Sequence, residues 1–437
     1  MHACGAGPPS LPLLKPSGTR PHCTREAHPI PPSTHCLPTA TTTTRARERL
    51  PAMSPRTTFT LQLLLVLVVV GLALAATTTA APAVLGGGKH HRGVLSTPVR
   101  RLKPDVRVSK LGGGGGGAGA VTVTSVGEAL SLWKNLTGAH FVIYLTAGTY
   151  EEHIVVPERC SNVVLIGDGV GRTIITGALS DRTGHNVMQS ATMSVFAKGF
   201  MARDVTIQNT AGGPGINQAV ALRVQADRTV FYRCQIHGYQ DTLMAESHLQ
   251  FYRECEISGT VDFIFGDATA VFQDCIVFAR RPADGKHDVI TAQGRGAHLG
   301  GSGFVLQNCS ITTAPGESLN GVQTYLGRPW NDHATVVYML CTIDDIIHAD
   351  GWVAWNKTNP KERVKGGVKP GHEGHIFYGE FANHGAGANV DHRVDWHGFH
   401  RLNEAQARLY APGRFIQGGA WLPQTGVPHY LGLRDGE

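Results

Sequence analysis

Two aspartates occupy the same position in a repeated segment of this 437-residue chain. Residues 231–236 read Phe-Tyr-Arg-Cys-Gln-Ile, and residues 251–257 repeat them as Phe-Tyr-Arg-Glu-Cys-Glu-Ile. Asp241 and Asp262 each follow the cysteine of their own repeat by seven residues, so the two acids are 21 residues apart. A fold that stacks the repeats on one another would make their carboxylates neighbours.

Two stacked carboxylates have a specific chemistry. Strands that stack in register lie about 4.8 Å apart, so the two groups would be about 5 Å apart. Like charges this close cannot both ionise easily, and one pKa rises. The pair then supplies an acid and a nucleophile from one residue type. The alternative is two polar turn residues, but Asp262 lies in Thr-Val-Asp-Phe-Ile-Phe-Gly, where a carboxylate among large apolar residues needs a partner.

Other polar and aromatic residues could complete such a site. Arg328, in Leu-Gly-Arg-Pro-Trp, supplies a guanidinium that can bind a carboxylate at two points. Trp330 and Tyr239 have flat faces suited to sugar rings. Gln218 and Gln240 have amide donors for a developing oxyanion. Taken singly, the arginine could be a surface charge and the two glutamines an internal amide ladder.

The elements that must position these residues follow a short repeat. A cysteine followed two residues later by Ile or Val recurs with steps of 21, 20, 34 and 32 residues, at Cys234, Cys255, Cys275, Cys309 and Cys341. Short apolar runs bounded by Gly, Asn or Asp leave no room for a helix in each repeat. This pattern predicts an all-β solenoid, a parallel β-helix, with the surplus residues of the longer repeats in lateral loops.

The stacked cysteines allow two interpretations. Neighbours in the stack could form the disulfides Cys234–Cys255 and Cys275–Cys309, or they could be small buried apolar residues. The spacing does not choose between them. No CxxC pair occurs, which disfavours zinc-ribbon and thioredoxin-like sites.

The chain divides into four parts. Residues 1–52 are rich in Pro, Thr, His and Arg, and are expected to be disordered or a spurious upstream extension. Residues 53–76 contain an apolar run at 59–76 that predicts a signal peptide or a signal anchor, so membrane contact is expected only if this run is not cleaved. Residues 77–118 are interpreted as a basic, Gly-rich linker, and residues 119–433 as the solenoid domain.

The charge distribution argues against one class of partner, and local motifs indicate a helix and export from the cell. Residues 1–118 contain 14 Lys and Arg against three Asp and Glu, whereas the remainder contains 25 against 30, which argues against a nucleic-acid partner. A helix is predicted around Val126–Leu136, with Ser125 as its N-cap. Glycosylation sequons at Asn135, Asn308 and Asn356 agree with export.

The chain resembles the plant-type pectinesterases (pectin methylesterases, carbohydrate esterase family 8). The resemblance covers about residues 119–433. Five matching segments occur in the family's order: Gly148–Glu151, Gln218–Arg223, Gly238–Leu243, Asp262–Gly266 and Leu326–Trp330. Further similarity covers Ala292–Arg295, Tyr378–Glu380 and Trp421–Pro428. The fold of this family is a right-handed parallel β-helix, in agreement with the repeat.

The resemblance also implies a role for each site residue. Asp262 would be the nucleophile and Asp241 the general acid and then the general base. Gln218 and Gln240 would stabilise the tetrahedral intermediate, and Arg328 would keep Asp262 ionised. The implied activity is hydrolysis of galacturonate methyl esters in pectin, in the cell wall, without a cofactor or metal.

Trp330 would line the sugar subsite. One departure lies at Val187, where the family usually has a threonine that contacts substrate. The implied partners are methyl-esterified homogalacturonan and a proteinaceous pectinesterase inhibitor. The family's inhibitor-like N-terminal domain is expected to be absent, because the segment before the solenoid is short. One alternative is a pectate lyase or polygalacturonase on the same solenoid. A lyase would need calcium-binding carboxylates and an Arg base. Another alternative is an inactive wall-binding homologue.

Overall fold

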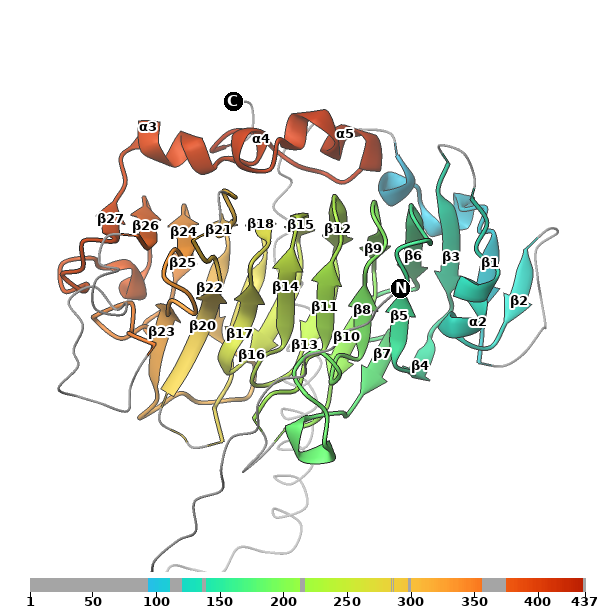
Figure 1. Cartoon of the computed structure of the whole chain (residues 1–437), viewed down its shortest axis with the longest axis horizontal. Helices are drawn as coiled ribbons and strands as arrows, with labels where there is room; N and C mark the ends of the chain where they lie inside the picture. The colour runs from blue at the N-terminus through green and yellow to red at the C-terminus, as the bar shows by residue number, and fades with distance from the viewer. Residues whose placement is uncertain are drawn as a thin grey trace, which may run out of the picture. The chain divides into compact units, whose positions relative to one another are not determined.

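The chain forms a right-handed parallel β-helix (Figure 1). The repeat predicted the parallel β-helix, and the family resemblance implied its handedness. The computed structural model describes residues 93–110, 120–135, 139–212, 217–283, 285, 287–297, 300–355 and 375–434. Each full coil contributes one strand to each of three parallel sheets, A, B and C. Successive strands of a sheet therefore come from successive coils, and residues one repeat apart become neighbours.

Apart from β1, which lies between β2 and β3 in sheet A, the strands of each sheet follow each other along the axis in chain order. Sheet A contains β2 (Val121–Val123), β1 (Val106–Val108), β3 (Phe141–Leu145), β6 (Val163–Gly167), β9 (Met201–Arg203), β12 (Thr229–Tyr232), β15 (Leu249–Arg253), β18 (Thr269–Gln273), β21 (Gly303–Gln307), β24 (Thr335–Met339), β26 (Phe377–Phe381) and β27 (Phe399–Arg401). Sheet B contains β4 (Gly148–Glu151), β7 (Thr173–Gly177), β10 (Thr206–Asn209), β13 (Gln235–His237), β16 (Glu256–Gly259), β19 (Ile276–Ala279), β22 (Ser310–Thr313) and β25 (Thr342–Ile343). Sheet C contains β5 (Ile154–Val156), β8 (Met193–Val195), β11 (Leu222–Gln225), β14 (Leu243–Ser247), β17 (Val261–Gly266), β20 (His287–Gln293) and β23 (Gln323–Gly327).

Helices are short and lie outside the coils. They are α2 (Val126–Ser131), α3 (Glu404–Ala407), α4 (Pro412–Phe415) and α5 (Leu422–Thr425), with the 3-10 turns η1 (Val94–Ser96), η2 (Val99–Arg101), η3 (Asp181–Thr183), η4 (Ala386–Ala388), η5 (Arg408–Tyr410) and η6 (Gly418–Ala420). The predicted start of α2 is confirmed, because the Ser125 side chain accepts from the Glu128 N–H at 3.1 Å. The helix ends at Ser131, earlier than predicted.

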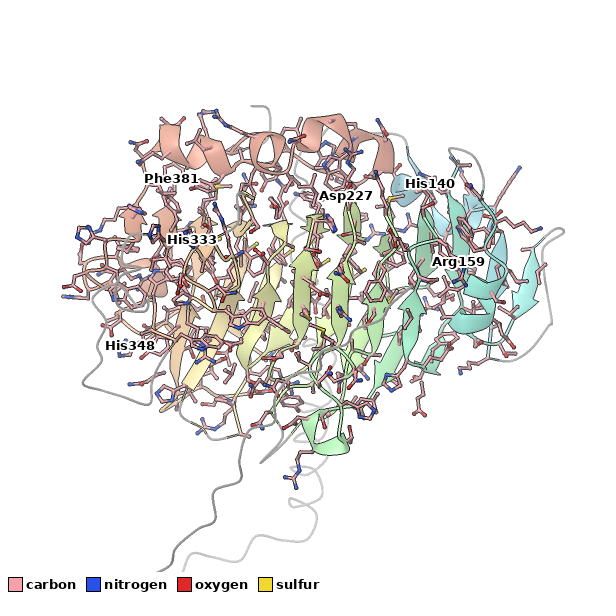
Figure 2. The ribbon with its side chains drawn as sticks, in the orientation of Figure 1. His140, Arg159, Asp227, His333, His348 and Phe381 are labelled. Carbon is pink, nitrogen blue, oxygen red and sulfur yellow. The ribbon has the colours of Figure 1, made fainter. Side chains whose placement is uncertain are left out.

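The interior of the coils is a single apolar core, and the repeated Cys-x-Ile/Val motif forms part of it. Ile236 pairs in register with Ile257, which pairs with Val277, and all three are fully buried. Beside them the rings of Phe231 and Tyr252 stack with centroids 5.2 Å apart. Side chains fill the space between the sheets (Figure 2). Residues of the same kind therefore stack on one another along the solenoid axis, and this keeps successive coils in register.

The structure contains the six described cysteines as free, buried thiols. The disulfide interpretation for Cys234, Cys255, Cys275 and Cys309 is therefore not the one observed. Thiols along the stack contact main-chain carbonyls of the preceding coil instead: Cys255 Sγ lies 3.3 Å from the Phe231 oxygen. The cysteines act as small apolar residues with a weak donor, the second interpretation offered by the sequence.

The expected linker over 77–118 is wrong for residues 93–110. This stretch adds β1 to sheet A, where Val106 pairs with Ile143 of β3. Leu95 and Val106 are buried, and the Arg203 guanidinium donates to the Thr97 carbonyl at 2.9 Å. Alternating valines in this stretch indicate a β-strand, but the glycine and charge content of the segment led to the prediction of a linker. Residues 1–92, including the predicted signal segment, lie outside the described residues.

The C-terminal segment covers the outer face of sheet A. Trp421, Leu422 and Val427 pack on apolar side chains of that face, such as Phe251 and Val271. In Figure 1 the helices α3 to α5 run along one side of the solenoid. Sheet A is thereby closed on both faces, which leaves the outer face of sheet C available for a site.

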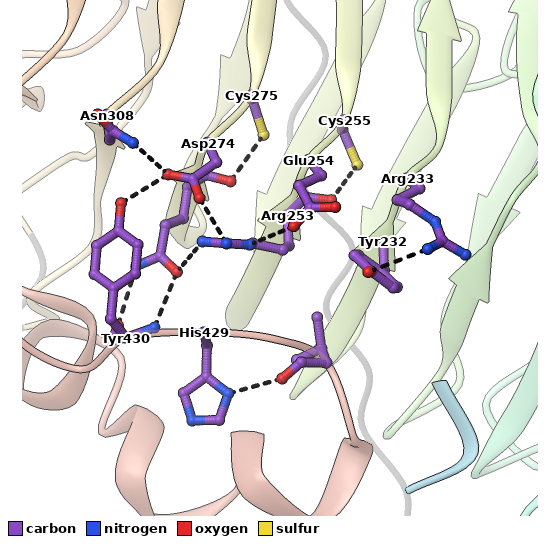
Figure 3. Close-up of polar contacts among 12 residues, drawn as sticks. Tyr232, Arg233, Arg253, Glu254, Cys255, Asp274, Cys275, Asn308, His429 and Tyr430 are labelled. Carbon is purple, nitrogen blue, oxygen red and sulfur yellow. Dashed lines mark hydrogen bonds and ion pairs between the residues drawn. The ribbon is translucent and has the colours of Figure 1, made fainter. Parts of the chain in front are cut away.

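Polar contacts fasten this segment at the corner between sheets A and B (Figure 3). The Tyr430 hydroxyl donates to Asp274 at 2.7 Å, and Arg253 pairs with the same carboxylate at 2.6 Å. Asn308 donates to Asp274 at 2.7 Å from the next coil. No helix in the described part of the chain is long and apolar enough to cross a membrane.

Candidate active site

A cavity of about 220 Å³ opens on the outer face of sheet C. The described residues that line it are Val187, Gln218, Gln240, Asp241, Asp262, Phe265, Ala292, Arg328, Trp330 and Trp355. The structure thus brings together six of the seven residues predicted for catalysis or sugar binding, together with the departure at Val187. They come from the coils that contain β8, β11, β14, β17 and β23, so only the stacking of coils unites them.

The two aspartates occupy equivalent places in successive coils, as their spacing predicted. Leu243 of β14 pairs with Ile264 of β17, the same 21-residue offset that relates Asp241 to Asp262. The Asp241 N–H donates to the Val261 carbonyl at 3.1 Å, which joins the two segments directly. Both side chains are almost fully buried, with 8% and 5% of their surface exposed.

Both aspartates have left-handed backbones, with φ of 62° at Asp241 and 54° at Asp262. Aspartate tolerates this region better than most residues because its short polar side chain can bond locally. At Asp262 the ladder between β17 and β20 shifts register between Val261 and Ile264. The irregularity interrupts the strand alternation where Asp262 turns toward the cavity.

Arg328 binds Asp262 at two points. Its Nε donates to Oδ1 at 2.7 Å and its Nη2 donates to Oδ2 at 2.5 Å. The guanidinium carbon also lies 4.2 Å from the ring centre of Trp355, which covers the pair. A planar two-point contact under an aromatic ring fixes the carboxylate orientation and balances its charge.

The second carboxyl, Asp241, forms no ion pair with any residue that the structure describes. Burial raises its pKa well above the usual range, and the charge of Asp262 raises it further, while Arg328 opposes the shift. Asp241 therefore tends to carry a proton where an ordinary aspartate has lost it. The two chemically identical side chains are thus differentiated by their surroundings, one paired with a cation and one able to hold a proton.

Gln218 and Gln240 reach the cavity from neighbouring coils. The Gln240 carbonyl accepts from the Ala219 N–H at 3.2 Å, and the Gln218 carbonyl accepts from the Asp181 N–H at 3.2 Å. Their main chains are held by these bonds, and both residues line the cavity. Two amide donors beside two carboxylates are suited to an oxyanion.

Trp330 forms an aromatic rim. Its ring lies edge-on to Phe265, with centroids 6.0 Å apart, and it is 39% exposed. The ring lies so close to Gly294 that a Cβ there would be 2.6 Å from it. Asn331 donates to the Gly294 carbonyl at 2.7 Å, which holds the two segments together. Glycine is therefore required at 294 for the ring to lie against the main chain.

Sequence reasoning missed three lining residues. Phe265 and Ala292 are register neighbours on β17 and β20 and form the apolar floor. Strand alternation from Asp262 could not locate Phe265, because the register shift changes the face. Trp355, 40% exposed, had no motif that marked it, since only the path of the chain after β25 brings it over Arg328.

Tyr239 is the one predicted binding residue that does not line the cavity. The guanidinium carbon of Arg280 lies 3.9 Å from its ring centre, and Arg280 also donates to its hydroxyl at 2.9 Å. Arg280 is in turn held by Glu317 at 2.8 Å. A sugar-binding role for Tyr239 stays a prediction. Among the described residues, no group of three or more His, Cys, Asp or Glu is arranged to hold a metal ion.

Comparison with known proteins agrees with this geometry. A family model described as Pectinesterase matches residues 116–419, more than half of the chain. The chain belongs to the pectinesterase family. The match includes every residue that lines the cavity.

Relatives and solved structures extend the family assignment. The chain is 42% identical over 332 residues to "Putative pectinesterase/pectinesterase inhibitor 38" of Arabidopsis thaliana, covering 76% of this chain and 66% of that protein. It is 42% identical over 316 residues to "Pectinesterase 2" of Citrus sinensis, covering 71% and 58% respectively. The structure of pectin methylesterase from carrot aligns with a TM-score of 0.69 at 38% identity, covering 77% of this chain and 99% of that one. The chain thus spans less than two thirds of either curated relative.

Proposed function

We propose that the chain hydrolyses the methyl esters of galacturonate in pectin and releases methanol. The observation that carries this proposal is the unequal pair of aspartates. Asp262 is held by Arg328 at two points, and the pKa of its neighbour Asp241 is raised by burial. A nucleophile and an acid at one ester carbonyl are what hydrolysis through a covalent intermediate requires. The carrot pectin methylesterase, at 38% identity, supports this reaction.

The first half of the reaction consumes the ester. A carboxylate oxygen of Asp262 attacks the ester carbonyl carbon, and the carbonyl electrons move onto the oxygen. The amides of Gln218 and Gln240 donate to that oxyanion. The intermediate collapses with cleavage of the bond to the methoxy group, which takes the proton of Asp241 and leaves as methanol. An acyl-enzyme anhydride on Asp262 and an ionised Asp241 remain.

The second half restores both carboxyl groups. Ionised Asp241 removes a proton from a water molecule, whose oxygen attacks the acyl carbonyl carbon. The bond to Asp262 breaks and the galacturonic acid is released. Asp241 is protonated again and Asp262 is again a carboxylate paired with Arg328. The net change is one ester and one water converted to one acid and one methanol.

The alternatives raised from the sequence have less support. A pectate lyase or polygalacturonase shares the solenoid, but the family match and the solved pectin methylesterases favour an esterase. An inactive wall-binding homologue would be expected to lack part of the set. Gln218, Gln240, Asp241, Asp262 and Arg328 all line the cavity.

The decisive experiment measures methanol from highly esterified pectin. Wild type is expected to release methanol steadily, and Asp262→Asn to reduce release to the level without protein, because the amide is a poor nucleophile. The control is Asp227→Asn, which changes a surface carboxylate outside the cavity and is expected to keep the wild-type rate. Equal rates for wild type and Asp262→Asn would refute the proposal. Ultraviolet-absorbing products without methanol would support the lyase instead.

The proposal extends to where the chain acts and what it meets. Its substrate would be methyl-esterified homogalacturonan in the cell wall, reached after secretion with 59–76 as signal. Plant pectinesterases among the relatives support this location, and names that combine pectinesterase with pectinesterase inhibitor support an inhibitory protein partner. Mass spectrometry of the N-terminus of secreted protein tests cleavage. An intact segment 59–76 in that material would contradict it.

A further inference from the structure

The chain after β25 returns along sheet C, beside β23 at the end of that sheet. Residues 346–355 are here named the Trp352 loop. Trp352 forms a parallel bridge with Gly327, and the Val353 N–H donates to the Gly327 carbonyl at 3.1 Å. Gly327 directly precedes Arg328. The loop is therefore bonded to the main chain at the base of the guanidinium that binds the proposed nucleophile.

The Trp352 ring packs against β23 at this point. A Cβ on Gly327 would lie 3.0 Å from the ring and 2.3 Å from Thr291 Oγ1. The ring is 1% exposed and stacks on Tyr378 with centroids 4.1 Å apart. From β20, the Thr291 carbonyl accepts from the Arg328 N–H at 2.9 Å. The end of β23 thus lies between β20 and the Trp352 ring, so a shift of the ring would move the base of Arg328.

A buried ion pair fixes the orientation of Trp352. The indole Nε1 donates to Glu380 Oε1 at 3.2 Å. Arg393 Nε donates to the same oxygen at 2.8 Å, and its Nη2 donates to Oε2 at 3.2 Å. Each of the two charged side chains is 2% exposed. Because the desolvation of two charges offsets much of their attraction, such a pair adds little net stability, and what it provides is a fixed geometry.

Arg393 also holds the main chain of the Trp352 loop. Its Nη1 donates to the Ala349 carbonyl at 3.2 Å. It lies across Gly351, whose φ is 67° and where a Cβ would be 2.4 Å from Arg393 Cδ. The loop continues to Trp355, whose ring centre lies 4.2 Å from the guanidinium carbon of Arg328. Arg393 therefore fixes the course of the loop that brings Trp355 to Arg328.

We propose that the buried Glu380–Arg393 ion pair positions Arg328 for catalysis, acting through Trp352 and its loop. This inference rests on the proposed pectin methylesterase function. Glu380, Arg393 and Trp352 are not among the described residues that line the cavity, so they are positioning residues and not catalytic residues. A planar two-point contact between Arg328 and Asp262 requires a fixed main-chain position for the arginine, and the buried pair supplies that support.

Trp352→Phe tests the link between the ion pair and β23. Phenylalanine keeps an aromatic ring against Tyr378 but has no N–H for Glu380. The quantities measured are kcat and KM for methanol release from highly esterified pectin. We expect kcat to fall about three- to tenfold, the effect of one hydrogen bond. KM should stay within twofold of wild type, because the Trp330 ring packs against Gly294.

Trp421→Phe is the matched control. Trp421 is 6% exposed, packs on the outer face of sheet A, and donates from Nε1 to the Ile416 carbonyl at 2.9 Å. The same substitution removes the same kind of bond there, and kcat should stay within twofold of wild type. If Trp352→Phe fails to fold, Arg393→Lys makes the same test. Lysine keeps a charge beside Glu380 but lacks the planar fork that also bonds the loop, so kcat should fall by a similar factor.

A double variant separates positioning from general destabilisation. Arg328→Lys already lacks the two-point contact with Asp262. If Trp352 acts through that contact, adding Trp352→Phe to Arg328→Lys should change kcat by less than twofold. A role of Trp352 in folding alone would instead multiply the two effects.

The outcomes separate this inference from the proposed function. An unchanged kcat in Trp352→Phe, or equal losses in Trp352→Phe and Trp421→Phe, would overturn the positioning role. A three- to tenfold loss from Trp352→Phe within Arg328→Lys would also overturn it. In each of these cases, methanol release by wild type would leave the esterase function standing. No methanol from wild type would overturn the esterase function and the positioning role together.

Discussion

Asp241 and Asp262 lie 21 residues apart in the chain and one coil apart in space. The Asp241 N–H donates to the carbonyl of Val261, so the two acids are linked through the residue that precedes Asp262. One carboxylate is bound at two points by Arg328, and the other has no ion pair within the described part of the chain. This asymmetry within a repeat is the basis on which we propose a nucleophile at one of two equivalent positions and an acid at the other.

Asp241→Asn should stabilise the fold while it abolishes acid catalysis. Burial raises the pKa of Asp241 in the folded state above its unfolded value, so the unfolded chain loses this proton at lower pH. Asp241 therefore destabilises the fold increasingly as the pH rises from about 4, the unfolded value, through the folded pKa. The melting temperature of the variant should be above that of wild type at pH 7 and equal to it near pH 3. Its methanol release should be about 10²- to 10⁴-fold slower. A lower melting temperature at pH 7 would contradict this.

Arg328→Lys tests the two-point contact rather than the charge. A lysine keeps the positive charge but cannot bond both oxygens of Asp262 in one plane. Loss of one charge-assisted bond is expected to lower kcat/KM on pectin by about 10- to 100-fold. Steady-state methanol release measures this. A rate within twofold of wild type would show that charge alone is sufficient.

Gly294→Ala should affect sugar binding more than catalysis. The added Cβ would meet the Trp330 ring at 2.6 Å and push it from the rim. Because an aromatic contact contributes about 1 kcal/mol, KM should rise about fivefold with little change in kcat. Gly301→Ala is the matched control, since a Cβ there meets nothing within 4 Å. Similar KM values for both variants would argue against the role of Gly294.

Asp288 on β20 is a fully buried carboxyl outside the cavity. Burial raises its pKa well above the usual range against the opposing Val289 N–H, and the charge of Asp262 adds to the shift. By the same linkage, Asp288→Asn should raise the melting temperature at pH 7 and leave it unchanged near pH 3. Asp391→Asn, on an exposed carboxylate, is the control and should change stability by less than about 0.5 kcal/mol. A pH-independent effect of Asp288→Asn would refute the prediction.

The sequence determined the solenoid and its acid pair. A repeat near 20 residues with one Cys-x-Ile or Cys-x-Val per coil can bury its apolar positions only by stacking, and stacking places Asp241 beside Asp262. Local rules also predicted the Ser125 cap. These features were readable because each depends on neighbours in the chain or on an exact repeat.

The tertiary structure alone decided the rest. Disulfides and free thiols fit the same spacing, and only the thiol–carbonyl contacts of residues such as Cys255 distinguish them. Trp355 reaches Arg328 because the chain returns over the sheet, and residues 93–110 join sheet A by pairing with β3. The surroundings of Asp241 and Asp262 differ because burial raises the pKa of Asp241 and one guanidinium binds Asp262. Such effects depend on distances between residues far apart in the chain, and a sequence repeat does not encode them.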